Sequence, residues 1–205
     1  MRPLRVAILC SRRCPGAADL LGDRRRGWRW ELAGVLTSEE DMAERPLFAR
    51  AHVPVLSRPI RGFYSRSGRP LSDLATRREY DQTVAHALAA FEADLLLLSG
   101  YTYLVTEPVL SAFSGRIVNV HGSDLTRVGS DGRPMYLGLR AVRDAIFAGE
   151  PETRATAHWV TEELDMGPPI LRSRAFPVSP LAADALARGD IRALKAYAFA
   201  HQEWM

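Results

Sequence analysis

Short apolar segments recur along the first part of the chain and predict buried strands. They are Leu4 to Cys10, Trp30 to Thr37, Val53 to Leu56, Asp94 to Gly100 and Arg116 to Val120. Short runs without strict alternation, bounded by turn residues, are typical of parallel strands that are buried on both faces.

Segments with helical spacing separate these runs. In Leu74 to Ala93, the side chains of Tyr80, Val84, Leu88 and Phe91 recur at one helical face. Further helices are predicted after Gly16 and over Leu104 to Phe113, Leu137 to Gly149 and Ile191 to Met205, where the chain ends. Residues 57–72 are rich in Arg, Gly, Pro and Ser without periodicity, and predict a long loop.

The order of these elements predicts the fold class. Alternating strands and helices favour an α/β fold with a mainly parallel sheet flanked by helices. Ala155 to Thr161 and Ile170 to Val178 are expected to pair as antiparallel strands near the C-terminus. We expect residues 1–205 to form a single domain.

Composition restricts the possible partners. The chain has 205 residues, 47% hydrophobic and 25% charged, which is ordinary for a globular protein. Its net charge is +3 and its basic residues are nearly all arginine, a bias that reflects genome composition more often than nucleic-acid binding. No apolar run is long enough to span a membrane, and Cys10 and Cys14 are expected to be free thiols. We therefore expect a cytoplasmic protein that binds no nucleic acid, membrane or metal.

Two short motifs carry candidate chemistry. Asn119-Val120-His121 closes one apolar strand, and Asp165 follows another. An amide can stabilise an oxyanion, an imidazole can transfer protons, and a carboxylate can orient and charge the imidazole. Because ligands of parallel sheets bind beyond the carboxyl ends of the strands, His121 and the segment after Gly100 are expected at a site.

The stretch from Leu95 to Val178 resembles the folate-dependent formyltransferases, especially the glycinamide ribonucleotide formyltransferase branch. The matching residues are Gly100, Gly115 to His121, Gly138-Leu139, Ala145-Ile146, Gly149, His158 and Glu162 to Leu171, with weaker similarity at Arg77 and Tyr80-Asp81. The resemblance implies a Rossmann-like formyltransferase fold and an enzyme that transfers a formyl group from 10-formyltetrahydrofolate to an amine.

The resemblance also implies roles for individual residues. Asn119, His121 and Asp165 fall on catalytic positions: the amide holds the oxyanion, the imidazolium relays protons, and the carboxylate orients the ring and a water. The folate is expected to lie against Gly100, Tyr101, Thr102, Tyr103, Leu104, Val105, Leu164 and Gly167. The acceptor is expected to lie against Ser11, Arg12, Arg13, Arg77, Ser123 and Asp124. His158 is expected to support the site without reacting.

Departures from the family pattern bear on the acceptor. The loop from Cys10 to Gly16 lacks the glycine-rich phosphate loop of the purine enzymes, and Pro15 cannot donate an N–H. Gly122 replaces a proline, and a longer loop precedes Tyr136. We expect an N-formyltransferase, monomeric or homodimeric, acting on a small primary amine. The alternatives are phosphoribosylglycinamide formyltransferase, a formyltetrahydrofolate hydrolase and a non-catalytic folate-binding relative.

Overall fold

A computed structural model of the protein describes residues 2–204, with the backbone alone for residues 202–204. The chain divides into two compact units, Met1–Asn119 and Val120–Met205. The division falls within one strand, and the expectation of a single domain stays a prediction. Each unit is described by itself.

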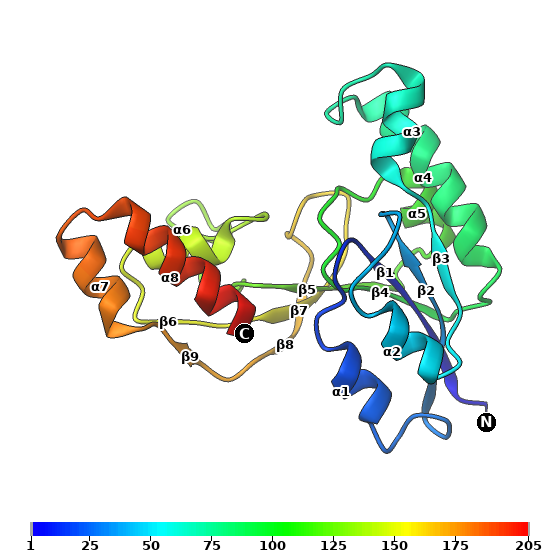
Figure 1. The fold of residues 1–205 in the computed structure, drawn as a ribbon, viewed down its shortest axis with the longest axis horizontal. Helices are drawn as coiled ribbons and strands as arrows, with labels where there is room; N and C mark the ends of the chain where they lie inside the picture. The colour runs from blue at the N-terminus through cyan, green and yellow to red at the C-terminus, as the bar shows by residue number, and fades with distance from the viewer. Residues whose placement is uncertain (1, 205) are drawn as a thin grey trace. The chain divides into compact units, whose positions relative to one another are not determined.

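The first unit is a parallel sheet with helices on both faces (Figure 1). Its strands are β1 (Leu4–Cys10), β2 (Trp30–Thr37), β3 (Val55–Ser57), β4 (Leu95–Leu98) and β5 (Ile117–His121), which continues into the second unit. Its helices are α1 (Ala17–Gly22), α2 (Arg45–Arg50), α3 (Ile60–Ser67), α4 (Leu74–Ala89) and α5 (Glu107–Ala112). The strand order is β3-β2-β1-β4-β5.

The strand register brings the carboxyl ends of four strands to one edge of this sheet. Cys10 pairs with Thr37, Leu9 pairs with Leu98, and Leu98 pairs with Asn119, all in parallel. The segments that follow these strands therefore begin side by side, as the sequence predicted.

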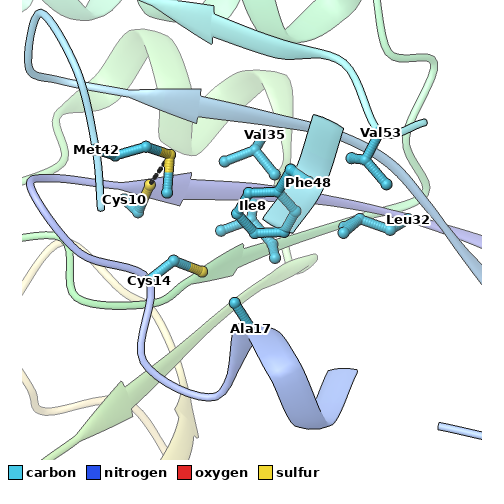
Figure 2. Close-up of a cluster of buried hydrophobic side chains, with 9 residues drawn as sticks. All are labelled: Ile8, Cys10, Cys14, Ala17, Leu32, Val35, Met42, Phe48 and Val53. Carbon is cyan, nitrogen blue, oxygen red and sulfur yellow. Dashed lines mark hydrogen bonds between the residues drawn. The ribbon is translucent and has the colours of Figure 1, made fainter. Parts of the chain in front are cut away.

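The core of the first unit shows why both faces are covered. Val35 of β2 packs with Phe48 of α2 in a buried cluster that also holds the free thiols of Cys10 and Cys14 (Figure 2). On the opposite face, a Cβ placed on Gly34 would lie 2.2 Å from the ring of Phe91, at the end of the α4 region. Neighbouring strand residues point to opposite faces, so helices pack against both.

The second unit combines helices with short antiparallel pairs. Its elements are α6 (Ala141–Phe147), β6 (Glu152–Thr153), β7 (Thr156–Trp159), β8 (Pro169–Arg172), β9 (Phe176–Pro177), α7 (Pro180–Ala187) and α8 (Ile191–Trp204). Strand β7 pairs with β8 and β6 pairs with β9, each antiparallel. Val142 and Ile146 of α6 pack with small residues of α7 and with Leu194 of α8.

The predicted fold class is confirmed: a mainly parallel sheet flanked by helices, with antiparallel pairing near the C-terminus. One prediction was wrong, because residues 60–67 form helix α3 where a loop was expected. Ile60 and Tyr64 are one helical turn apart and both are buried. Packing of these two side chains outweighs the poor helix propensity of Gly62, Ser65 and Ser67.

Within the described residues, no helix combines the length and the apolar character needed to cross a bilayer.

Candidate active site

His121 lies at the carboxyl end of strand β5, where its side chain is buried. Asn119 precedes it by two residues on the same strand, so both side chains project from the same face. His121 Nε2 lies 3.1 Å from the backbone carbonyl oxygen of Tyr136. A carbonyl only accepts, so this contact requires a proton on Nε2.

The other ring nitrogen of His121 faces a carboxylate. Its Nδ1 lies 3.5 Å from Asp165 Oδ2, and both side chains are less than one-tenth exposed. The same carboxylate oxygen accepts a hydrogen bond of 2.8 Å from the backbone N–H of Gly138. The charged imidazolium would therefore have an acceptor beside each of its N–H groups.

Asp165 has a backbone conformation that non-glycine residues rarely adopt. Its φ is 55°, in the left-handed region, and the residue lies in the turn that precedes β8. Such a conformation costs on the order of 1 kcal/mol and persists where the surrounding structure demands it. The nearby Gly167 is equally constrained, because a Cβ there would lie 1.7 Å from the carbonyl oxygen of Trp159. The strained turn holds the Asp165 carboxylate toward His121.

His158 joins this pair from strand β7. Its Nε2 lies 3.8 Å from Asp165 Oδ1, and its ring meets the His121 ring edge-on at 6.4 Å. Its Nδ1 lies 2.9 Å from the carbonyl oxygen of Trp159, which requires a proton on that nitrogen. Burial lowers the pKa of His158 below the ordinary value, more than the nearby carbonyl and carboxylate raise it. The expected supporting role agrees with this placement against Asp165.

Ser123 and Asp124, predicted to contact the acceptor, form hydrogen bonds with other residues of the second unit. Ser123 Oγ donates to the Tyr136 carbonyl at 2.6 Å. Asp124 accepts from Thr126 and from Arg172 Nη1, the latter at 2.9 Å. Burial acts to raise the pKa of Asp124, but these hydrogen bonds outweigh it and lower the pKa. Contact of either residue with an acceptor stays a prediction.

In the first unit, the structure gathers several of the predicted folate and acceptor residues. Ser11 N donates to the Gly100 carbonyl at 3.2 Å, and Thr102 N donates to Ser11 Oγ at 3.1 Å. Gly100 has a φ of 65°, and a Cβ there would lie 2.7 Å from the Arg13 carbonyl oxygen. Only glycine lets this segment pass so close to the loop after β1.

Helix α4 fixes the other end of the predicted folate segment. The buried guanidinium of Arg77 donates to the Leu104 carbonyl at 3.2 Å and lies over the Tyr103 ring. Asp81, one turn further along the helix, accepts from both the backbone N–H and the hydroxyl of Thr106 at 2.7 Å. Arg77 therefore supports this loop, and its predicted contact with the acceptor stays a prediction.

The remaining predicted residues differ in exposure. Arg12 and Arg13 are exposed on the loop between β1 and α1, and Leu164 is 54% exposed beside Asp165. The Tyr101 and Tyr103 rings meet edge-on at 5.9 Å, and burial raises the pKa of both hydroxyls. Val105 is buried. Among the described residues, no cluster of His, Cys, Asp and Glu is arranged to hold a metal ion.

The amino-acid sequence did not reveal the roles of Tyr136 and Gly138. Both contact the His121–Asp165 pair through backbone atoms, so their side chains carry no signal for these contacts. The resemblance did include Gly138, and its φ of 72° is a conformation that glycine adopts readily.

Comparisons with known proteins identify the family. The family model described as "Formyl transferase" matches residues 4–187. Phosphoribosylglycinamide formyltransferase of Escherichia coli K12 is 32% identical over 99 residues, covering 48% of this chain and 43% of that protein. Formyltetrahydrofolate deformylase of the same organism is 29% identical over 169 residues, covering 82% of this chain and 52% of that protein. The chain thus spans about half the length of these curated relatives.

A solved structure supports the same assignment. Glycinamide ribonucleotide transformylase 1 from Symbiobacterium toebii aligns with a TM-score of 0.68 and 29% identity, covering 98% of this chain and 85% of that one. The resemblance seen in the sequence, including its leaning toward the glycinamide ribonucleotide enzymes, is confirmed. The chain belongs to the formyl transferase family.

Proposed function

We propose that this protein is an N-formyltransferase that moves the formyl group of 10-formyltetrahydrofolate to a primary amine of a small molecule. One observation carries the proposal: a buried imidazole–carboxylate pair, His121 and Asp165, with the amide of Asn119 two residues before the histidine on strand β5. These are the groups that formyl transfer needs, and the chain belongs to a family named for that reaction.

The proposed reaction begins when the acceptor amine attacks the formyl carbon and a tetrahedral intermediate forms. Asn119 donates its side-chain N–H to the oxyanion, a contact worth about 3 kcal/mol in comparable sites. His121, charged beside Asp165, stabilises the intermediate. The new carbon–nitrogen bond stays, the bond to the folate nitrogen breaks, and a proton passes from the amine to that leaving nitrogen.

The folate is proposed to lie against the segment from Gly100 to Val105 and against Leu164 and Gly167. Support for the first segment comes from its anchoring by Ser11 and Arg77, which leaves little freedom in its backbone. A fixed backbone can present its N–H and carbonyl groups to the edge of a pterin.

The acceptor is proposed to be an amine other than glycinamide ribonucleotide. The loop after β1 carries Pro15 and exposed Arg12 and Arg13 in place of a run of glycine N–H groups. Helix α1, which follows, has only six residues. The second candidate is phosphoribosylglycinamide formyltransferase, and it is favoured by the relatives that carry this name. Arginine side chains would then hold the phosphate.

We also propose that the protein works in the cytoplasm, as a monomer or homodimer, without nucleic acid. The buried free thiols of Cys10 and Cys14 are in keeping with a reducing compartment.

A screen of candidate amines with 10-formyltetrahydrofolate tests the proposal, with release of free tetrahydrofolate followed by absorbance. The amines include amino sugars, amino acids and glycinamide ribonucleotide. Release that depends on an added amine supports transfer, and the active amine identifies the acceptor. Release without any amine, together with formate, would support a hydrolase. No release under any condition would contradict the proposal and support a non-catalytic folate-binding protein.

A further inference from the structure

A chain of contacts within the second unit links His121 to a glutamate outside the predicted site. We infer that Glu150 is a positioning residue for His121 and acts through Tyr136. The inference rests on the proposed function for its catalytic consequence, whereas its structural part concerns the ligand-free protein alone.

The first link is the carbonyl oxygen of Tyr136. It lies 3.1 Å from His121 Nε2 and also accepts from Ser123 Oγ at 2.6 Å. Because this oxygen belongs to the backbone, its position depends on where the Tyr136 residue is held.

The second link is the side chain of the same residue. The Tyr136 hydroxyl donates to Glu150 Oε1 at 2.8 Å, and the ring is buried. Burial, followed by the bond to Glu150, raises the pKa of Tyr136 to about 12. The hydroxyl therefore keeps its proton, and donates it, at any pH at which the protein would be assayed.

The third link is an ion pair between Glu150 and Arg127. The guanidinium of Arg127 forms an ion pair with Glu150 Oε2, and the Glu150 side chain is only 12% exposed. Met135 N donates to the Arg127 carbonyl at 2.9 Å, and Val128 and Pro134 form an antiparallel bridge. Arg127 and Tyr136 thus stand at the base of one hairpin, and a single carboxylate holds both of its arms.

This arrangement gives the enlarged loop before Tyr136 a function. Two oxygens of Glu150, on the segment after α6, fix the hairpin base, and the base fixes the carbonyl beside the His121 ring. Removing the carboxylate frees both arms and leaves the hydroxyl of the buried Tyr136 without its acceptor, so the Tyr136 carbonyl should shift. The His121 ring then loses the partner that sets its orientation toward Asp165.

Nitrogen-15 NMR of histidine side chains in the ligand-free protein tests the structural part. In the wild type, the His121 Nε2 proton should show the low-field shift and slow exchange of a hydrogen-bonded proton. Glu150→Ala and Tyr136→Phe should both weaken this signal, whereas Glu150→Gln, which keeps an acceptor for the tyrosine hydroxyl, should retain much of it. Glu152→Ala is the matched control, since its carboxylate accepts from Arg154 and not from Tyr136.

Turnover with the acceptor found above tests the catalytic part. Tyr136→Phe should lower kcat by about tenfold to a hundredfold while the KM for the folate changes little, because misplacement of a catalytic group by about 1 Å has effects of this size. Should Glu150→Ala fail to fold, Tyr136→Phe and Glu150→Gln carry the test. Unchanged His121 signals in these variants would overturn the inference whatever the activity. A wild type without turnover would refute the proposed function and leave the NMR result to decide the positioning role.

Discussion

At the scale of single residues, the central arrangement is a histidine with an acceptor at each ring nitrogen. The Tyr136 carbonyl faces His121 Nε2, and Asp165 faces Nδ1. Both contacts are buried, and electrostatic interactions are stronger in the protein interior than at the surface. The two acceptors would therefore stabilise a positive charge on the ring when a tetrahedral intermediate forms beside it.

Replacing the histidine tests its role most simply. His121→Ala should abolish formyl transfer and leave folate affinity within a few-fold, because the proposed folate contacts lie elsewhere in the sequence. Turnover and equilibrium binding of the folate are measured separately. His86→Ala, on the exposed face of α4, is the matched control and should keep full activity. A His121→Ala enzyme with most of its turnover would remove the histidine from the mechanism.

The amide of Asn119 has a separate prediction. Asn119→Asp removes the donor and places negative charge beside the oxyanion, so the rate should fall by at least about a hundredfold. Asn119→Ala removes the donor alone and should retain more activity than the aspartate variant. Steady-state rates at saturating folate give the comparison. Near-normal turnover of the aspartate variant would show that another group holds the oxyanion.

The residue types of the site could be predicted from the sequence, but their backbone could not. Asn119, His121 and Asp165 stand out because few other residues supply this chemistry after buried strands. The left-handed conformation of Asp165 and the carbonyl contact of Tyr136 left no such trace. Both arise from the tertiary structure, which a local pattern does not encode.

At the scale of elements, the turn between β7 and β8 is held by a close approach of two backbones. A methyl group on Gly167 would lie 1.7 Å from the Trp159 carbonyl oxygen. Gly167→Ala should therefore lower the free energy of unfolding by about 1–3 kcal/mol, as overpacking usually does. It should also lower turnover, because the turn carries Asp165. Urea denaturation and rate measurements on the same preparation check both effects.

Gly22→Ala is the matched control for this prediction. Gly22 ends helix α1, and no atom lies within 4 Å of an added Cβ. Alanine also favours a helix more than glycine does, so this variant should be as stable as the wild type or slightly more so. Equal stability of the Gly167 and Gly22 variants would mean that the turn accommodates the added methyl group without loss of folding free energy.

Elements with a continuous run of buried apolar residues were predicted correctly. Elements that form mainly because a few side chains pack against the rest of the protein were missed. Strands β1, β2, β4 and β5 were found at their apolar runs. Helix α3 was missed because only Ile60 and Tyr64 mark its buried face. Helix α7 was not predicted either, although Ser179 accepts from Leu181 N at its start and Pro180 follows, a recognisable N-terminal signal.

At the scale of the whole molecule, two buried histidines make folding depend on pH. Burial lowers the pKa of both His158 and His201. The unfolded chain then binds more protons than the folded one, so stability is present above the ordinary value of about 6.5 and is lost as the pH falls toward the lower folded pKa. His158 faces Asp165 and His121, while His201 contacts Thr153.

Urea denaturation at a series of pH values from about 5 to 8 checks this behaviour, because this range includes the ordinary histidine pKa of about 6.5 and the acid side of it. His158→Asn keeps a side-chain N–H for the Trp159 carbonyl and cannot be protonated, so it should reduce the loss of stability in acid. His201→Gln should reduce it independently. A loss of the same size in both variants and the wild type would assign the acid sensitivity to other groups.

The most direct test of the account follows the formyl carbon itself. The protein is incubated with 10-formyltetrahydrofolate labelled with carbon-13 in the formyl group and with the amine identified by the screen, and the products are analysed by mass spectrometry. Formyl transfer predicts one labelled formyl amine for each tetrahydrofolate released, and none with His121→Ala. Label found only in formate, or retained entirely on the folate, would contradict it.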